Sequence, residues 1–378
     1  MTATLRQAAG SLLVVGLSGT ELTNLERAWL KLVGPAGVIL FRRNIEGPRQ
    51  TRALLDEATK LSCGLSATHC FRCVDVEGGV VDRLRDALAP MPSAQAVMLA
   101  ATHTGKLSLI REHGELIARG VKAFGFNTTL GPVVDLALPE SARVLGTRAA
   151  AATPEGVVDY ARNFLAGLAA QGVVGCGKHF PGLGGGVDDS HLETPVIRRS
   201  QRELWQKDLA PYRELRSELP MIMVNHAAYP ETPGKNQPAS ASPYWITTML
   251  RKRLGYWGLI FSDDMEMGGI LKFMPIEKAA VAAIRAGMDI LEICHSPELI
   301  LRAFEALIAE GERSAAFRKL LLARAGQTAR TRARLFPGGV PKELTAKQFE
   351  SLRASVLSFS NTVAEAAKAT PETEALSA

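Results

Sequence analysis

Short apolar segments recur along the chain at regular intervals, with little alternation between apolar and polar residues. They span residues 11–17, 37–41, 71–76, 129–135, 173–180, 221–226, 259–263 and 290–294. Uninterrupted runs of Val, Ile and Leu are typical of strands that are covered on both faces, as parallel strands usually are. The pattern therefore predicts eight buried strands.

Stretches with helical periodicity separate these strands. The clearest cover residues 51–61, 107–123, 154–171, 243–254 and 277–286. Alternating strands and helices pair in parallel, and eight such units predict an α/β fold of the (β/α)8 TIM-barrel type. A doubly wound open sheet is the alternative, but no G-x-G-x-x-G motif follows the first strand. The glycine-rich residues 182–186 follow the fifth strand instead, which is weak support for a dinucleotide site.

The two ends of the chain differ from this pattern. After Pro337 the periodicity changes: residues 342–369 predict one or two helices against the barrel, and residues 370–378 predict a frayed polar tail. We therefore expect a barrel domain over residues 1–336 and a C-terminal extension over residues 337–378. At the other end, the apolar run is short for a signal peptide and lacks a clear cleavage site. We interpret it as the first strand and expect a cytoplasmic protein.

Composition and charge narrow the class of protein. Hydrophobic residues make up 47% of the chain and charged residues 22%, which is usual for a soluble globular enzyme. No apolar run reaches the roughly 18–20 residues that span a membrane. The net charge of +6 is scattered rather than gathered in a stripe, so we expect neither a nucleic-acid nor a membrane partner.

The cysteines are few and odd in number, which argues against a disulfide framework. They are Cys63, Cys70, Cys73, Cys176 and Cys294. His69, Cys70 and Cys73 have a hint of metal-ligand spacing, but no second pair matches them. We therefore expect five buried free thiols and no metal site.

Polar residues gather where the predicted strands end. They are Asp75, Glu77, Asp135, Lys178, His179, Asn225, His226, Ser262, Asp263, Asp264 and His295. In a barrel the carboxyl ends of the strands carry the active site, and buried charges are costly unless they are paired. The pattern favours a catalytic set, and the alternative is a ring of salt bridges that closes the mouth of the barrel.

The loop after the fifth strand carries the most distinctive chemistry. Its glycine-rich part is followed by Asp188, Asp189, Ser190 and His191. In an extended segment the side chains of Asp189 and His191 lie on one face. A carboxylate beside an imidazole sets its tautomer and raises its pKa toward neutrality, as a general acid and base requires. Spacing alone equally allows a surface Asp–His pair.

Taken together, these motifs resemble glycoside hydrolase family 3, and within it the single-domain bacterial β-N-acetylglucosaminidases of the NagZ type. The similarity extends from about residue 10 to about residue 300. It is carried by residues 37–44, 75–83, 127–135, 143–148, 178–191, 238–243 and 259–267. Residues 178–191 align with the family motif K-H-F-P-G-H-G-x-x-x-x-D-S-H without a gap.

The resemblance implies a role for each matching residue. Asp263 would be the nucleophile that forms a covalent glycosyl-enzyme, and His191, oriented by Asp189, would be the acid and base. The anomeric configuration would be retained. The sequence itself has no metal cluster and no phosphate-binding loop of the P-loop type, so we expect no cofactor. The implied substrate is a saccharide or muropeptide that contains N-acetylglucosamine, and we expect a monomer. The sugar would be held by Asp75, Arg83, Arg148, Lys178 and His179.

The chain departs from the family pattern at a few positions. Leu183 stands where the family has His, and Gly185, Val80 and Asp82 replace other polar or charged residues. These changes imply altered contacts around the loop and leave a weakly active sugar-binding homologue as an alternative. The sequence also allows a family 3 β-glucosidase or xylosidase, which usually carries the acid on an extra domain, or a phosphorylase, because His tolerates phosphate.

Overall fold

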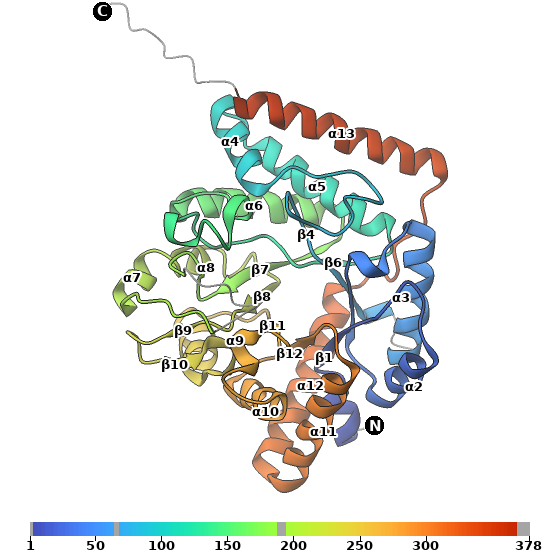
Figure 1. Cartoon of the computed structure of the whole chain (residues 1–378), viewed down its shortest axis with the longest axis vertical. Helices are drawn as coiled ribbons and strands as arrows, with labels where there is room; N and C mark the ends of the chain where they lie inside the picture. The colour runs from blue at the N-terminus through green and yellow to red at the C-terminus, as the bar shows by residue number, and fades with distance from the viewer. Residues whose placement is uncertain (1–2, 64–67, 187–193, 369–378) are drawn as a thin grey trace, which may run out of the picture.

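Eight parallel strands form a closed barrel in the computed structural model, which describes residues 3–63, 68–186 and 194–368 (Figure 1). In chain order they are β1 (Leu13–Gly16), β2 (Gly37–Leu40), β3 (Phe71–Val74), β6 (Thr128–Thr129), β7 (Val174–Phe180), β8 (Met221–Val224), β11 (Leu259–Asp264) and β12 (Ile290–Ile293). β1 pairs with β12 on one side and with β2 on the other. This closure confirms the predicted TIM barrel, and the open-sheet alternative is wrong.

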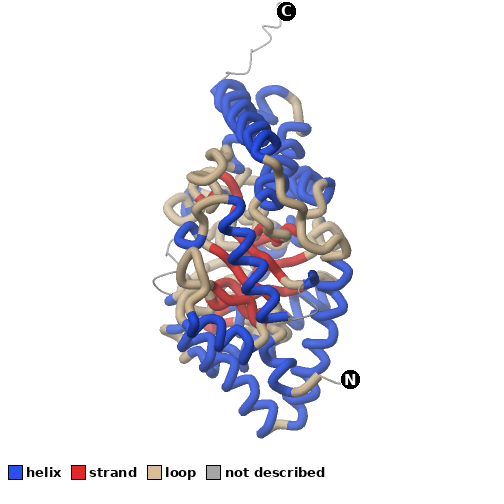
Figure 2. The backbone as a smooth tube through the Cα atoms, turned by 90° about the vertical axis from the view of Figure 1, so that its right-hand side faces the viewer, coloured by secondary structure: helices blue, strands red, loops and turns tan. Residues whose placement is uncertain are grey.

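Helices surround the barrel on all sides, as the blue tubes around the red strands in Figure 2 show. Those of the first half are α1 (Leu5–Gly10), α2 (Asn24–Val33), α3 (Pro48–Cys63), α4 (Ala94–Thr104), α5 (Ser108–Ala123) and α6 (Pro154–Ala170). Those of the second half are α7 (Gln201–Gln206), α8 (Ala210–Glu214), a π-helix (Tyr244–Arg253), α9 (Gly268–Leu271), α10 (Ile276–Ala286), α11 (Pro297–Arg313), α12 (Ala315–Leu335) and α13 (Ala346–Lys368). Each predicted helical stretch coincides with one of these elements.

Two short antiparallel sheets lie outside the barrel. They pair β4 (Val76–Gly78) with β5 (Val81–Asp82), and β9 (Ala228–Tyr229) with β10 (Lys235–Pro238). The first hairpin directly follows β3 and the second directly follows β8. Both therefore extend barrel strands at their carboxyl ends, where the site is built.

Local signals in the sequence explain where the helices begin and end. At α2 the Thr23 hydroxyl accepts a hydrogen bond from the Glu26 amide, and the Glu26 carboxylate accepts one from the Thr23 amide. The same carboxylate accepts hydrogen bonds from Ser18, which ties the end of β1 to this helix. Gly34 ends α2 with a φ of +61°, a conformation that glycine adopts without strain.

The barrel interior is packed with apolar side chains. These include Val14, Ile39, Phe71, Cys73, Leu130, Val174, Cys176, Met221, Met223, Leu259, Phe261 and Ile290. Phe336, which follows α12, packs edge-on against Phe71 with ring centroids 5.3 Å apart and closes one end of the barrel. The residues that line the cavity described below lie at the other end, where the strands finish.

The C-terminal extension forms one long helix. α13 packs against α4 and α5 and lies at the top of Figure 1. It buries Leu352, Val356, Phe359 and Val363, whose spacing of four, three and four residues makes one apolar stripe. Within the described ranges, no helix is long and apolar enough to cross a bilayer.

The expectation of five free thiols is wrong for two cysteines. Cys63 at the end of α3 and Cys70 just before β3 are joined in a disulfide, with Cα atoms 6.7 Å apart. The short connection from α3 to β3 brings both residues to the same end of the barrel, which the sequence spacing alone did not show. Cys70 is therefore unavailable to a metal. The free and buried thiols are Cys73, Cys176 and Cys294.

Candidate active site

Charged side chains form the layer directly above the apolar interior of the barrel. Asp75, Lys178 and Asp263 each lie two residues after an inward-facing residue of their strand, and Glu292 lies two residues after Ile290. Those preceding residues are Cys73, Cys176 and Phe261. Because alternate residues of a strand point to the same face, all four charged side chains point into the barrel.

This charged layer is the floor of a cavity of about 500 Å³ at the carboxyl end of the strands. Its lining includes six residues that the sequence analysis singled out: Asp75, Arg83, Arg148, Lys178, His179 and Asp263. It also includes Arg42, Arg43, Asp264, Glu292 and His295. Asp189 and His191 lie outside the described residues. The structure thus brings together every described residue predicted for nucleophilic attack or sugar binding.

Asp263 is the carboxylate best placed to act as a nucleophile. Its Oδ1 accepts a hydrogen bond of 2.9 Å from the Asp264 amide, and no described residue forms an ion pair with it. Burial would raise the pKa of Asp263, but His179, His226, the Asp264 amide and Lys178 together hold that pKa below its usual value. The group is therefore ionised at neutral pH, as attack on an electrophilic carbon requires.

His226 fixes the backbone that carries Asp263. Its Nε2 lies 3.0 Å from the Asp264 carbonyl oxygen, and its Nδ1 lies 2.7 Å from the Ser240 hydroxyl. Burial lowers the pKa of His226, so the ring is neutral. Nε2–H then donates to the carbonyl, and Nδ1 accepts from the hydroxyl. Sequence reasoning placed His226 at a strand end without this positioning role.

A buried ion-pair network lies beside Asp263. Lys178 Nζ lies 2.9 Å from Asp75 and 2.6 Å from Glu77, and Arg148 makes a bidentate contact with Glu77 at 2.8 and 2.9 Å. Burial would raise the pKa of Glu77, but Arg148 and Lys178 hold it well below its usual value. The salt-bridge ring considered from the sequence therefore exists in part, but it borders an open cavity rather than closing the mouth.

His179 is held in one orientation by Asp135. The Asp135 carboxylate accepts hydrogen bonds from His179 Nδ1 at 2.7 Å, from the His179 amide at 3.1 Å and from the Leu183 amide at 2.7 Å. His179 Nε2 therefore remains an acceptor and lies 3.4 Å from Arg148. Leu183 is 6% exposed and lines the cavity. The residue that replaces the family's His is therefore buried in the cavity wall.

The other departures from the family pattern have local explanations. Val80 is exposed and lies outside the cavity lining. Asp82 is buried and its carboxylate accepts hydrogen bonds from two backbone amides of the following loop. A Cβ on Gly185 would lie 2.5 Å from Nε of Arg199, which binds Asp208 at 2.7 Å. These residues shape loops, and they leave the charged floor intact.

Glu292 is a member of the charged floor that sequence reasoning missed. It is 2% exposed, and its Oε1 has no hydrogen-bond partner among the described residues. Burial, together with the carboxylates of Asp75, Asp264 and Asp263, raises the pKa of Glu292 well above its usual value. The signal available in the sequence is a charged residue within an apolar strand run.

Glu292→Gln is expected to stabilise the protein at alkaline pH. A carboxyl group whose pKa is raised by folding contributes most to the stability of the folded protein below its ordinary pKa. This contribution is lost as the pH rises. The gain in the free energy of unfolding should be small near pH 4–5. It should reach roughly 1–3 kcal/mol near pH 8, which is the usual cost of a buried unsatisfied group. Calorimetric melts at both pH values measure it, with the exposed Glu350→Gln as control. A Glu292→Gln variant that is less stable at pH 8 than the wild type would contradict the argument.

The comparisons with known proteins agree with this geometry. Residues 4–320 match the model of the glycosyl hydrolase family 3 N-terminal domain. The chain belongs to glycosyl hydrolase family 3. It is similar to the β-hexosaminidase of Alkalilimnicola ehrlichii, with 38% identity over 297 residues that cover 76% of this chain and 82% of the relative.

Two solved structures are also similar. The glycoside hydrolase family 3 β-N-acetylglucosaminidase from Paenibacillus sp. str. FPU-7 superimposes with a TM-score of 0.84 at 28% identity, covering 95% of this chain and 69% of that one. NagZ from Neisseria gonorrhoeae, in complex with N-trifluoroacetyl-D-glucosamine, has a TM-score of 0.74 at 28% identity and coverages of 93% and 98%. These relatives confirm the predicted glycoside hydrolase class and its β-N-acetylhexosaminidase activity.

Proposed function

We propose that this family 3 enzyme is a retaining, exo-acting β-N-acetylglucosaminidase that works through a covalent glycosyl-enzyme at Asp263. The observation that carries the proposal is the position of Asp263: an inward-facing carboxylate of lowered pKa on the floor of a 500 Å³ cavity. A cavity of this size accepts one or two sugar rings and limits attack to the end of a glycan. Asp75, Arg83 and Lys178 line it and offer donors and acceptors for sugar hydroxyls.

The reaction has two displacement steps. In the first, a carboxylate oxygen of Asp263 bonds to the anomeric carbon while the bond to the leaving oxygen breaks and His191 gives that oxygen its proton. In the second, water attacks the anomeric carbon, the bond to Asp263 breaks, and His191 takes the proton from water. Two inversions give net retention. Asp189 is proposed to orient His191.

The residues that border the 187–193 segment support this assignment. On one side Leu183 lines the cavity and its amide is bound by Asp135. On the other side Thr194 donates a 2.7 Å hydrogen bond to the carbonyl of Gly269, two residues after Met267, which also lines the cavity. Both flanking stretches are therefore tied to the wall of the cavity that also contains Asp263, and an acid and base must act in that cavity.

His191→Ala should affect substrates unequally. p-Nitrophenolate leaves without protonation, so the rate of the glycosylation step on p-nitrophenyl N-acetyl-β-glucosaminide should fall only a little. On a disaccharide, whose leaving oxygen needs a proton, the rate of this step should fall about 10²–10⁴-fold. Pre-steady-state bursts and kcat/KM on both substrates measure this difference. Equal losses on both substrates would argue against the acid role.

The natural substrate is proposed to be a peptidoglycan fragment with an anionic group on the leaving sugar. Arg42, Arg43, Arg83 and Arg143 all line the cavity, and a cationic lining favours an acidic aglycone. A His–Asp acid also places less negative charge near that group than a second ionised carboxylate would.

Product analysis tests both the substrate and the reaction type. N-acetylglucosaminyl-anhydromuramic acid fragments should be cleaved with a higher kcat/KM than neutral chitobiose, and added salt should reduce the difference. The product should be N-acetylglucosamine of retained configuration, also in phosphate buffer. Release of the sugar 1-phosphate would instead identify a phosphorylase, binding without turnover would identify a sugar-binding homologue, and preference for a glucoside would identify a β-glucosidase.

We further propose a monomeric cytoplasmic enzyme, with residues 1–336 as the barrel domain and residues 337–378 as the extension. The three free, buried cysteines agree with a reducing compartment. In the cytoplasm the disulfide between Cys63 and Cys70 would be exposed to reducing conditions. The redox state of this cysteine pair in cell extracts therefore tests the location. No cofactor is part of the proposed reaction.

A further inference from the structure

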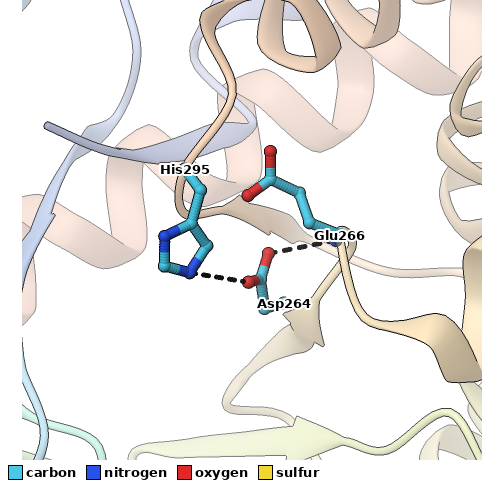
Figure 3. A group of neighbouring side chains, drawn as sticks. All are labelled: Asp264, Glu266 and His295. Atoms are coloured by element: carbon cyan, nitrogen blue, oxygen red, sulfur yellow. Dashed lines mark hydrogen bonds and ion pairs between the residues drawn. The ribbon is translucent and has the colours of Figure 1, made fainter. Parts of the chain in front are cut away.

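A group of three potential ligands lies on the wall of the cavity, next to the nucleophile. Asp264 ends β11, Glu266 follows in the next loop, and His295 follows β12 (Figure 3). One ligand atom from each of the three side chains lies within 4.8 Å of the others. The proposed reaction uses none of these side chains. The group therefore needs an explanation of its own.

The distance between His295 and Asp264 fits a shared ligand better than a direct contact. Nε2 of His295 lies 3.6 Å from Oδ2 of Asp264, which is too long for a hydrogen bond. Two ligands that each lie about 2.0–2.2 Å from a tetrahedral Zn²⁺ are about 3.3–3.6 Å apart. The observed separation falls at the upper end of that range.

Hydrogen bonds and ring stacking hold the three side chains in place. Asp264 accepts a hydrogen bond from the Glu266 amide through Oδ1, which leaves Oδ2 toward His295. Glu266 accepts a 2.6 Å hydrogen bond from the Ser296 amide through Oε1. The His295 ring stacks on Phe41 with centroids 5.3 Å apart. Such contacts orient metal ligands before the metal arrives.

An unsatisfied oxygen gives independent support. Oε2 of Glu266 is shielded from solvent, yet it has no hydrogen-bond partner within the described part of the chain. Neither Asp264 nor Glu266 forms an ion pair with a described Lys or Arg. A buried carboxylate oxygen without a partner costs free energy, and a cation at this position would remove that cost.

We propose that Asp264, Glu266 and His295 form a binding site for a divalent cation of the zinc class. One imidazole with two carboxylates suits Zn²⁺ or a similar transition ion, whereas Mg²⁺ and Ca²⁺ prefer oxygen ligands alone. Three protein ligands leave a fourth position for water or substrate. Because Asp264 and His295 also line the cavity, the ion would add positive charge to the wall beside Asp263.

Metal titration of the purified full-length enzyme tests the site without relying on activity. After treatment with EDTA, calorimetric titration with ZnCl₂ should show one equivalent bound. Glu266→Gln and His295→Gln should each weaken that binding by about tenfold or more, and MgCl₂ should not compete. Co²⁺ should give the visible absorption of a four-coordinate site, and Glu266→Gln should abolish it.

His191→Ala is the control that separates this site from the proposed acid and base. It should bind zinc as the wild type does, because it leaves all three ligands in place. Zinc binding that is lost in His191→Ala but kept in Glu266→Gln would assign the ion to the Asp189–His191 pair and overturn the proposal. Absence of binding in the wild type, or binding unaffected by both glutamine variants, would also overturn it. Thermal melts confirm that each variant is folded.

Discussion

Asp263→Ala is expected to lower kcat on p-nitrophenyl N-acetyl-β-glucosaminide by on the order of 10⁴-fold or more, the usual cost of removing a covalent nucleophile. The carboxylate points into the cavity and is held ionised by its surroundings, so no other described group replaces its attack on the anomeric carbon. KM should change less, because the sugar-binding side chains remain. Steady-state kinetics on the purified variant measure both constants.

Chemical rescue makes this test specific for a nucleophile. In Asp263→Ala the shortened side chain leaves room for azide, which should attack the anomeric carbon from the same face and restore turnover. The product should be the α-glycosyl azide, because only one inversion then occurs. Glu298→Ala, which removes an exposed carboxylate on α11, is the matched control and should keep full activity. High activity of Asp263→Ala without azide would refute the assignment.

Much of the fold followed from the sequence because strand positions are set by local composition. Every predicted barrel strand overlaps an observed one, and the polar residues at their ends converge because parallel strands of a barrel end on one face. Asp75, Lys178 and Asp263 could be found in this way. Their inward direction follows from the period of two along each strand.

Other features depend on contacts that no local pattern encodes. Glu77 follows β3, whereas its partners Arg148 and Lys178 come from much later in the chain, so pairing required the closed barrel. Likewise, the ligand group joins the end of β11 to the loop after β12. Its signal is a buried oxygen without a partner, which exists only in three dimensions. The disulfide between Cys63 and Cys70 was missed for the same reason.

The buried network around Lys178 should be the part of the site most sensitive to loss of charge. Lys178→Met removes the only side chain that contacts both Asp75 and Glu77 among the described residues, and the lysine side chain is 4% exposed. Removing one partner of a buried pair typically costs about 3–5 kcal/mol, because the remaining charge stays buried. Urea unfolding at neutral pH should show a loss of this size. The exposed Lys106→Met is the control and should change stability little.

The pH dependence and a second substitution separate the charge effect from the loss of packing. The lowered pKa of Glu77 means that its stabilising contribution is present above the ordinary pKa of glutamate and is lost as the pH falls. The difference in the free energy of unfolding between wild type and Lys178→Met should therefore narrow below about pH 4, because carboxyl groups freed by the substitution take up protons there. Adding Asp75→Asn to Lys178→Met should recover part of the loss at neutral pH, since without Lys178 the Asp75 carboxylate is left with a single ion-pair contact of 3.9 Å, to Arg83, among the described residues. A gap that is independent of pH and a double variant without recovery would mean that Lys178 acts through its volume, and that the charged floor beside Asp263 is held by packing alone.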